Sequence, residues 1–362
     1  TGAFTVSLKA KVKTSFMSLA GYKTLDIDAF SEVKRGSSGP LEMVLALDTT
    51  YSMSESDKIG TLRTAATTLV NQVMATGNVK VGIAPFADYF KVGTKYEDED
   101  WVNVPASVTS SYESCSSISY PGRPRGRRVT GCSYDGVSYD CSYENCTNWG
   151  DPVKSGCSMV EDVNTWDGCV AARPPAYHNS IGNAEVPYPG VLWDCGSALV
   201  AMTTDKGSVL GAISGLYANG NTNIPSGLIW AWNLLTPEAP LTEAAPMSEI
   251  NAKGGKKVLV LMTDGVNTVS PYPDGNYGSH YDTGYGDETY TNNLTATLCQ
   301  KIKDEGTVVF TILFDVSDAA IETLLKNCAS DPDKSFVADD AYELLSAFDN
   351  IGASLSKLRL TR

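Results

Sequence analysis

Nearly continuous apolar runs recur along the chain, and stretches with helical spacing separate them. The runs cover residues 41–47, 79–86, 257–263 and 307–314. An uninterrupted run of this kind indicates a strand that is buried on both faces, as in a parallel sheet. Parallel strands need crossover connections, which are usually helices. The pattern therefore predicts an α/β fold whose doubly wound, mostly parallel sheet is flanked by helices.

The expected helices are segments in which apolar residues recur every three or four positions. They cover residues 59–73, 209–216, 224–235, 294–303, 319–327 and 341–358. Gly77 and Asn78 follow the first of these segments and provide a stop signal. Helices thus follow each of the expected strands, which is the order that a doubly wound domain requires.

Two parts of the chain depart from this alternation. Residues 1–40 alternate apolar and polar side chains, which predicts a β-hairpin segment, and Arg35 to Pro40 form a hinge. Residues 95–195 are rich in Tyr, Gly, Pro, Cys and Asp, which predicts an insertion of loops. We therefore expect an N-terminal β-strand segment at 1–40 and an α/β domain at 41–362, with the insertion at 95–195 inside that domain.

Most of the cysteines lie in the expected insertion. Of the nine cysteines, seven are found there: Cys115, Cys132, Cys141, Cys146, Cys157, Cys169 and Cys195. This crowding indicates disulfides formed in an oxidising compartment, whereas a zinc site would need paired C-x-x-C knuckles. Because seven is an odd number, at least one of these cysteines is free or pairs outside the segment. The chain is therefore expected to be extracytoplasmic.

The start of the chain bears on export. No signal peptide opens the sequence, and no run of about 20 apolar residues occurs in it. The strand-like alternation begins almost directly after Thr1. We therefore expect a leader or anchor upstream of Thr1, and a membrane contact only through that upstream segment.

The charge balance and the motif content argue against several function classes. The chain has 28 basic and 42 acidic residues and a net charge of -14, which disfavours a nucleic-acid partner because such a partner needs a basic face. Acidic loops suit divalent cations instead. The two histidines, His178 and His280, lie in loop-like sequence, and no G-x-S-x-G, H-E-x-x-H or G-x-x-x-x-G-K-[ST] motif occurs. We therefore expect a binding protein and not an enzyme.

Oxygen-bearing side chains follow the ends of two expected strands and precede one expected helix. They belong to Asp48, Thr50, Ser52, Thr222 and Asp264. In an open α/β sheet, ligands bind outside the carboxyl ends of the strands, so these side chains are expected to converge there. Carboxylate and hydroxyl oxygens suit a hard cation such as Mg²⁺. The alternative is a carboxylate cluster with a structural role only.

The motifs at these positions resemble the metal-ion-dependent adhesion site of von Willebrand factor A domains. The matching features are D-x-[ST]-x-S from Asp48, a threonine in a middle loop and T-D-G at Asp264. The resemblance implies that Thr50 and Ser52 bind the metal directly. It implies that Thr222 binds directly or through water and that the two aspartates bind mostly through water. The implied cofactor is a divalent cation, Mg²⁺ first, with Ca²⁺ or Mn²⁺ as alternatives.

This sequence departs from the usual motif at two positions. Thr50 replaces a serine and retains the hydroxyl, whereas Tyr51 replaces a glycine and would crowd or contact a partner. Because few of the implied direct ligands are charged, the cation would remain electrophilic enough to bind a carboxylate of a protein partner or surface ligand.

A tyrosine-rich loop from Pro271 to Tyr290 follows Asp264 closely and is expected over the same end of the sheet. Its tyrosines offer rigid, amphipathic contact area. With Tyr51, they would form a rim for the ligand that consists of Tyr51, Tyr277, Tyr281 and Tyr285. Alternatively, the loop only covers the sheet, since Gly and Asp are also plain turn formers.

Several other segments resemble TadG-type proteins of the tight-adherence (Flp/Tad) pilus system. They are residues 80–93, 227–239, the helix with Leu298 and Cys299, residues 327–330, and the tail from Leu358. The resemblance implies an A domain behind a minor-pilin-like or stalk-like N-terminal part, but it does not extend to the cysteine-rich insertion.

The function that this resemblance implies is metal-dependent adhesion or protein binding in a Tad (type IVc) pilus, as a minor-pilin-like or tip component that contacts other pilus subunits. The alternative is an envelope-bound structural or assembly component of the secretion machinery. The implied location is the cell surface or pilus in the first case and the periplasmic face of the envelope in the second.

The two remaining cysteines are expected to form a disulfide. Cys299 lies in the helix before the fourth strand, and Cys328 lies at the end of the helix after it. In a doubly wound sheet these helices are neighbours, so the two cysteines can come within bridging distance.

Overall fold

The computed structural model describes most of the chain. The described residues are 3–13, 24–34, 39–75, 77–119, 132–134, 137–139, 153–182, 186–271, 277–280 and 287–360. They belong to two compact units, of which the larger contains residues 1–105 and 166–362 and the smaller contains residues 106–165. Among the helices within these ranges, none is both long enough and apolar enough to cross a membrane.

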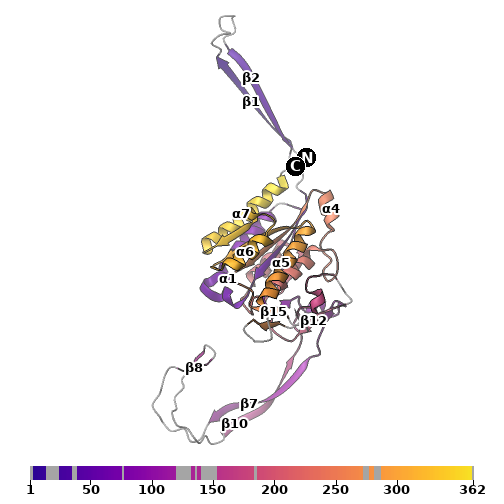
Figure 1. Ribbon diagram of the computed structural model, residues 1–362, viewed down its shortest axis with the longest axis vertical. Helices are drawn as coiled ribbons and strands as arrows, with labels where there is room; N and C mark the ends of the chain where they lie inside the picture. Colours follow the sequence, from indigo (N-terminus) through magenta and orange to yellow (C-terminus); the bar gives the residue numbers. More distant parts are fainter. Residues whose placement is uncertain are drawn as a thin grey trace. The chain divides into compact units, whose positions relative to one another are not determined.

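A six-stranded sheet forms the centre of the larger unit (Figure 1). In spatial order its strands are β13 (Val200–Thr203), β4 (Val79–Phe86), β3 (Leu41–Asp48), β14 (Lys256–Thr263), β17 (Val308–Phe314) and β18 (Ser335–Ala338). All neighbours are parallel except β13, which runs antiparallel to β4. The predicted α/β fold class is therefore confirmed.

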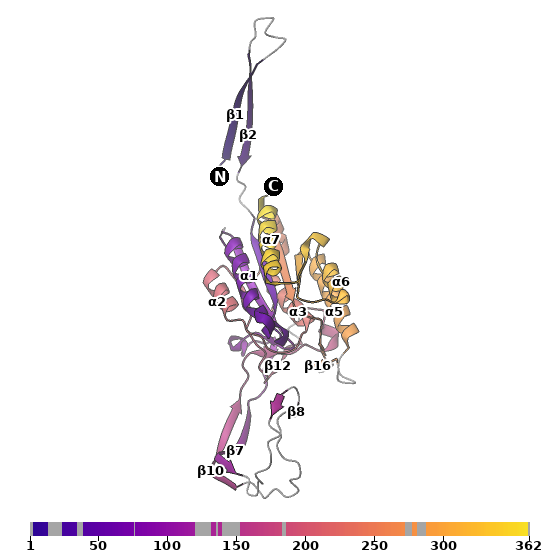
Figure 2. The same ribbon diagram turned by 90° about the vertical axis from the view of Figure 1, so that its left-hand side faces the viewer.

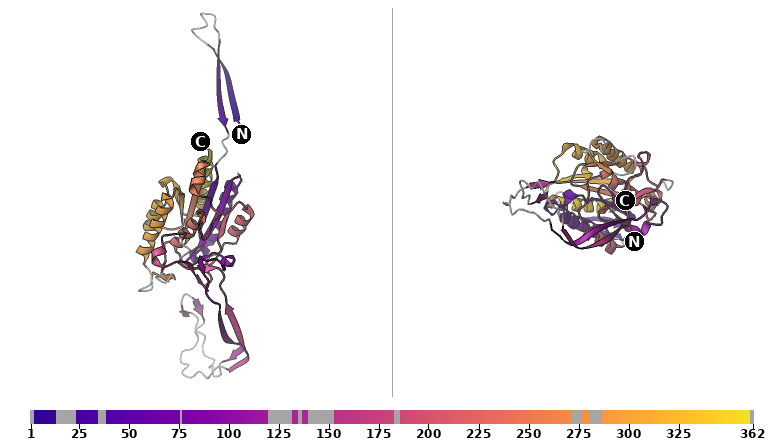
Figure 3. Two further views of the ribbon diagram at one scale, coloured as in Figure 1. Left: turned by 90° about the vertical axis from the view of Figure 1, so that its right-hand side faces the viewer. Right: turned by 90° about the horizontal axis from the view of Figure 1, so that it is seen from below.

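Helices cover both faces of this sheet (Figures 2 and 3). One layer consists of α1 (Lys58–Val73), α2 (Lys206–Ser214) and α7 (Ala341–Leu360), and the other of α3 (Ile224–Leu235), α5 (Glu288–Asp304) and α6 (Ala319–Cys328). Alternate residues of one strand serve the two layers: Met43 and Leu45 of β3 pack in the core under the first layer, and Val44 packs in the core under the second. Both faces of β3 are therefore buried, as its apolar run predicts.

The chain leaves β3 and β14 toward opposite faces of the sheet. After β3 it continues into α1, whereas after β14 it continues into α5 in the other layer. Because β3 and β14 are adjacent and parallel, their connections diverge at the carboxyl ends and form a topological switch point. This switch point is the place where an open α/β sheet usually binds its ligand.

Shorter elements complete the larger unit. They are the hairpin of β1 (Ala3–Lys13) and β2 (Thr24–Lys34), helix α4 (Met247–Ala252), the hairpin of β15 (Val269–Pro271) and β16 (Tyr277–Ser279), and a small sheet of β5 (Phe90–Lys91), β11 (Cys169–Val170), β12 (Tyr188–Val191) and β6 (Val102–Asn103). A disulfide joins Cys169 of the small sheet to Cys195.

The smaller unit corrects the expectation that the insertion consists of loops. It contains a long antiparallel ribbon of β7 (Val108–Ser119) and β10 (Val153–Asn164) and a short hairpin of β8 (Cys132–Tyr134) and β9 (Val137–Tyr139). The described side chains of the ribbon are mostly exposed, so the sequence lacks the alternation that marks a half-buried strand. A two-stranded ribbon is marginally stable by itself, and the disulfide between Cys115 and Cys157, which are paired across the strands, compensates for this.

A third disulfide joins Cys299 of α5 to Cys328 of α6, with the two Cα atoms 5.1 Å apart. Both side chains are buried in the core that α3, α5 and α6 share. The two cysteines are 29 residues apart, and β17 lies between them in the sequence, so the bridge closes a loop that contains this strand.

Replacing both Cys299 and Cys328 by alanine should lower the free energy of unfolding by about 3 to 4 kcal/mol, because the open loop restores entropy to the unfolded chain. Urea unfolding of the oxidised proteins would measure the difference. Alanine at Cys115 and Cys157 serves as a control, since it should leave the transition of the larger unit unchanged. Free thiols at Cys299 and Cys328 in a peptide map made without reductant would contradict the bridge.

Candidate metal centre

Asp48 ends β3 and is fully buried. Its Oδ1 accepts hydrogen bonds from the backbone N–H of Thr50 at 2.9 Å and from the Oγ1 of Thr50 at 2.7 Å. Its Oδ2 accepts a bond from the Oγ1 of Thr263, the last residue of β14, at 2.6 Å. The carboxylate therefore ties together the ends of the two strands that flank the switch point.

The other predicted residues join the same network. Thr50 Oγ1 lies 3.0 Å from Ser52 Oγ and accepts a hydrogen bond from Thr222 Oγ1 at 3.3 Å. Ser52 Oγ donates to Asp264 Oδ1 at 2.6 Å. The structure thus brings Asp48, Thr50, Ser52, Thr222 and Asp264 together in one cluster of carboxylate and hydroxyl oxygens.

Two backbone contacts join the loop after β3 to the loop before α3. The Asn219 N–H donates to the carbonyl of Thr49 at 2.7 Å, and the Tyr51 N–H donates to the carbonyl of Gly220 at 3.0 Å. The first loop then winds into the 3₁₀-helix η2 (Tyr51–Asp57), which leads directly into α1. Backbone pairing therefore sets the position of both hydroxyl-bearing loops.

Asn267 and Thr268 anchor the loop that carries Thr222, and no sequence pattern indicated either residue. The side chain of Asn267 is buried, accepts a hydrogen bond from the Ile224 N–H at 2.8 Å and donates to Asn292 of α5 at 2.8 Å. Thr268 beside it accepts from the Thr222 N–H at 2.9 Å and donates its own N–H to the Thr222 carbonyl at 2.9 Å. The T-D-G motif at 263–265 could have drawn attention to these residues, because they lie just beyond it.

The pKa values of two buried groups in the cluster are raised. Burial, together with the neighbouring charge of Asp264, raises the pKa of Asp48 to about 7. Lys58 at the start of α1 lies 3.1 Å from Asp264 and 3.0 Å from Asp315. Burial lowers the pKa of Lys58, but hydrogen bonds and charge attraction from Asp315 and Asp264 outweigh burial and raise it. The centre therefore holds two close carboxylates and one ammonium group.

The donor set suits a hard divalent cation. All five predicted ligands offer oxygen atoms, which are the ligands that Mg²⁺, Ca²⁺ and Mn²⁺ prefer, and no thiol or imidazole belongs to the set. The two carboxylates are both buried and would benefit from a nearby positive charge.

The rim predicted from tyrosines can be followed only in part. Tyr51 is 61% exposed beside the centre. The backbone of Tyr277 begins β16, but its side chain lies outside the described part of the structure, as do residues Tyr281 and Tyr285. Tyr217, which no sequence pattern indicated, is 41% exposed two residues before Asn219 and donates a hydrogen bond to Asp194 at 3.3 Å.

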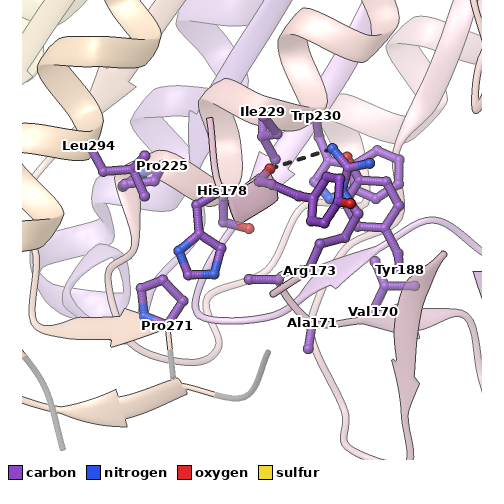
Figure 4. A pocket seen from close by; sticks show the side chains of 13 residues that line it. Val170, Ala171, Arg173, His178, Tyr188, Pro225, Ile229, Trp230, Pro271 and Leu294 are labelled. Atoms are coloured by element: carbon purple, nitrogen blue, oxygen red, sulfur yellow. Dashed lines mark hydrogen bonds between the residues drawn. The ribbon is translucent and has the colours of Figure 1, made fainter. Parts of the chain in front are cut away.

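A separate cavity lies beside the first turn of α3 (Figure 4). Arg173 and His178 project from the segment after β11, and the guanidinium lies 4.6 Å from the ring centroid of Tyr188. Burial holds the pKa of His178 below its ordinary value, and its Nδ1 lies 2.7 Å from the hydroxyl of Tyr290. Among the described residues that line this cavity, none carries a carboxylate, so it does not offer the ligand set of the metal centre.

Comparison with known proteins supports the fold. The sequence matches no protein-family model and no curated protein. Among solved structures, the chain is similar to the pilus adhesin SpaC from Lactobacillus rhamnosus GG in its open conformation, with a TM-score of 0.50 and 14% identity over 98% of this chain and 34% of SpaC. The chain thus spans about a third of the length of that adhesin.

Weaker similarities were also found. The vWF domain of the type V pili tip protein Mfa5 from Porphyromonas gingivalis gives a TM-score of 0.45 and 12% identity over 89% of this chain and 97% of that domain. Proximal thread matrix protein 1 from the mussel byssus, with a zinc-occupied MIDAS motif, gives a TM-score of 0.39 and 12% identity over 87% of this chain and 46% of that protein.

The hydrogen bonds of Asn267 lead to a prediction about both stability and metal binding. Asn267→Ala leaves the buried Ile224 N–H without its acceptor, which should cost about 1 to 3 kcal/mol in the free energy of unfolding. It should also weaken Mg²⁺ binding, although no candidate ligand is changed, because the loop that carries Thr222 loses its anchor at Ile224 and keeps only the bonds to Thr268. Urea unfolding and calorimetric titration with Mg²⁺ would measure both effects.

Asn292→Ala is the matched control for this experiment, because it removes the bond between Asn267 and α5 but keeps the contact with Ile224. It should affect Mg²⁺ binding less than Asn267→Ala. Unchanged Mg²⁺ affinity in a destabilised Asn267→Ala protein would show that Asn267 does not position Thr222.

Proposed function

We propose that this chain binds a protein partner or surface ligand through a divalent cation at the candidate metal centre. Thr50 and Ser52 would bind the cation directly, Thr222 directly or through water, and Asp48 and Asp264 mostly through water. Mg²⁺ is the favoured ion, with Ca²⁺ or Mn²⁺ as alternatives. The single observation that carries the proposal is the convergence of three hydroxyls and two buried carboxylates at the switch point of the sheet.

The proposed chemistry is the coordination of a carboxylate from the partner. A cation whose direct protein ligands are mostly neutral hydroxyls retains positive charge and can take an anionic oxygen from outside. Tyr51, which is 61% exposed, supports this proposal because it would contact the partner at the edge of the site. The loop with Tyr277, Tyr281 and Tyr285 is proposed to complete the rim.

The proposed setting is the outside of a bacterial cell, as a minor-pilin-like or tip subunit of a Tad pilus that contacts other pilus subunits. The three disulfides among the described residues and the fold similarity to part of the pilus adhesin SpaC support this setting. In this proposal residues 1–40 are a stalk or a minor-pilin-like part, residues 41–362 are the A domain and residues 95–195 are the insertion within it. The protein would act by binding and not as an enzyme.

Mg²⁺ should stabilise the larger unit against unfolding, by about 2.7 kcal/mol at a concentration one hundred times its dissociation constant. Thr222→Val and Asp48→Ala should reduce or abolish this stabilisation, because each removes a metal contact. Thermal unfolding with Mg²⁺ and with chelator would measure the effect. Thr297→Val, which removes an exposed threonine hydroxyl from α5, is the matched control and should behave as wild type. An unfolding midpoint that Mg²⁺ does not raise in the wild-type protein would contradict the metal site.

The location of the protein distinguishes adhesion from assembly. An antibody against residues 106–165 should label filament tips or the cell surface if the protein is an adhesive subunit. Attachment of cells to surfaces should then require a divalent cation and be lost in Thr222→Val. Labelling confined to the cell envelope, with attachment unaffected by chelator, would instead favour an envelope-bound component of the pilus machinery.

A further inference from the structure

Lys58 is a buried cation that contacts the candidate metal centre. Its side chain is 8% exposed, and its Nζ lies 3.1 Å from Asp264 Oδ2 and 3.0 Å from Asp315 Oδ2. Asp315 follows β17, the strand next to β14, so the ammonium group joins the ends of two adjacent strands. Its Nζ also lies 5.8 Å from the ring centroid of Phe314.

Local structure alone does not favour a lysine at this position. Lys58 is the first residue of α1, where the positive end of the helix dipole repels a cation, and burial adds a desolvation cost. The chain reaches this point through Ser56 and Asp57, whose φ values of 48° and 57° are rare for residues other than glycine. The ion pairs with Asp264 and Asp315 are the contacts that offset these costs.

The two carboxylate oxygens of Asp264 have different partners, and one of these partners is Lys58. Oδ1 accepts a hydrogen bond from Ser52 at 2.6 Å, whereas Oδ2 accepts one from Lys58 at 3.1 Å. With both oxygens engaged, the carboxylate is held in one orientation. Lys58 thus restrains the residue that the proposed function assigns mainly to water-mediated contact.

The formal charges explain what this ammonium group would do. Asp48, Asp264 and Lys58 are all buried, and with both carboxylates ionised, as they would be around a cation, the three groups carry a single net negative charge. A divalent cation would turn this into a single net positive charge, which an incoming carboxylate would neutralise. Without Lys58 the two carboxylates alone would neutralise the cation, so less attraction would remain for the partner. Asp315 counts for less because its side chain is 52% exposed and is screened by water.

We propose that Lys58 sets the charge of the metal centre: it weakens the hold on the divalent cation and thereby keeps the bound cation attractive to a partner's carboxylate. This inference rests on the proposed function, because it assumes that the centre binds a cation. It assigns Lys58 as a positioning and specificity-determining residue that contacts neither the metal nor the ligand.

The test is whether metal affinity and carboxylate affinity move in opposite directions. In Lys58→Met, Mg²⁺ should bind about tenfold more tightly, because a buried positive charge near the cation is removed. Acetate should bind the metal-loaded protein several-fold more weakly for the same reason. Calorimetric titration gives the Mg²⁺ affinity, and relaxation of the acetate methyl protons by protein-bound Mn²⁺ reports the approach of acetate to the metal.

Asp315→Asn changes the local charge in the opposite direction. Its result can be read even if Lys58→Met does not fold. Asparagine tolerates the left-handed backbone of Asp315, whose φ is 54°, and it removes one negative charge beside Lys58. Mg²⁺ should then bind a few-fold more weakly and acetate more tightly. Lys253→Met is the charge control, since Lys253 is an exposed lysine whose ion-pair partner is Glu249. It should change neither affinity.

The outcomes separate the inference from the function on which it rests. If the wild-type protein binds neither Mg²⁺ nor Mn²⁺, the proposed function fails, and the inference fails with it. If the wild type binds Mg²⁺ but Lys58→Met and Asp315→Asn both lose or both retain affinity, the inference alone is overturned, because Lys58 then has only a structural role. Opposite changes in the two variants, with acetate following in the reverse sense, would support it.

Discussion

Two carboxylates, Asp48 and Asp264, are buried beside each other at the ends of adjacent parallel strands. Like charges in a region of low dielectric repel each other strongly, and each also loses its hydration. The rise in the pKa of Asp48 expresses this cost. The surrounding structure compensates with the hydroxyls of Thr50, Ser52 and Thr263 and with the ammonium group of Lys58. These groups come from the loop after β3, from the end of β14 and from the start of α1, so the compensation depends on all three elements.

The sheet can tolerate this polar cluster because it lies where the two connections diverge. The middle of each strand, from Met43 to Leu47 in β3 and from Val258 to Met262 in β14, is apolar and packs in the cores under both helix layers. Polar side chains lie at the two ends of these strands: Glu42 and Lys257 form a buried ion pair near the starts, and Asp48 and Thr263 lie at the carboxyl ends. Stability and binding thus depend on different parts of the same strands.

The sequence predicted the central strands and the cluster but not the groups that support it. A continuous apolar run identifies β3, β4, β14 and β17 because each is buried on both faces. The short edge strands β13 and β18 have four residues each and leave no such run. The same rule that locates ligands at strand ends located the candidate metal ligands.

Lys58 and Asn267 illustrate why the rest could not be predicted. In the sequence Lys58 is an ordinary basic residue near a helix start, and its burial follows from contact with Asp264, which lies 206 residues away. Asparagine is a common turn residue, so Asn267 does not stand out in the sequence. Its role depends on hydrogen bonds to Ile224 of α3 and Asn292 of α5. Tertiary contacts of this kind leave no periodic pattern in a single sequence.

The chain begins and ends the smaller unit in two strands, β7 and β10, that pair with each other. Val108 lies opposite Asn164, close to the two boundaries of the smaller unit at residues 106 and 165. The first and last residues of the ribbon therefore lie close together, as the two ends of a hairpin do. Exchange, shortening or extension of the ribbon would change what the protein displays without altering the register of the central sheet. The register of the central sheet therefore does not depend on the length or the sequence of the ribbon.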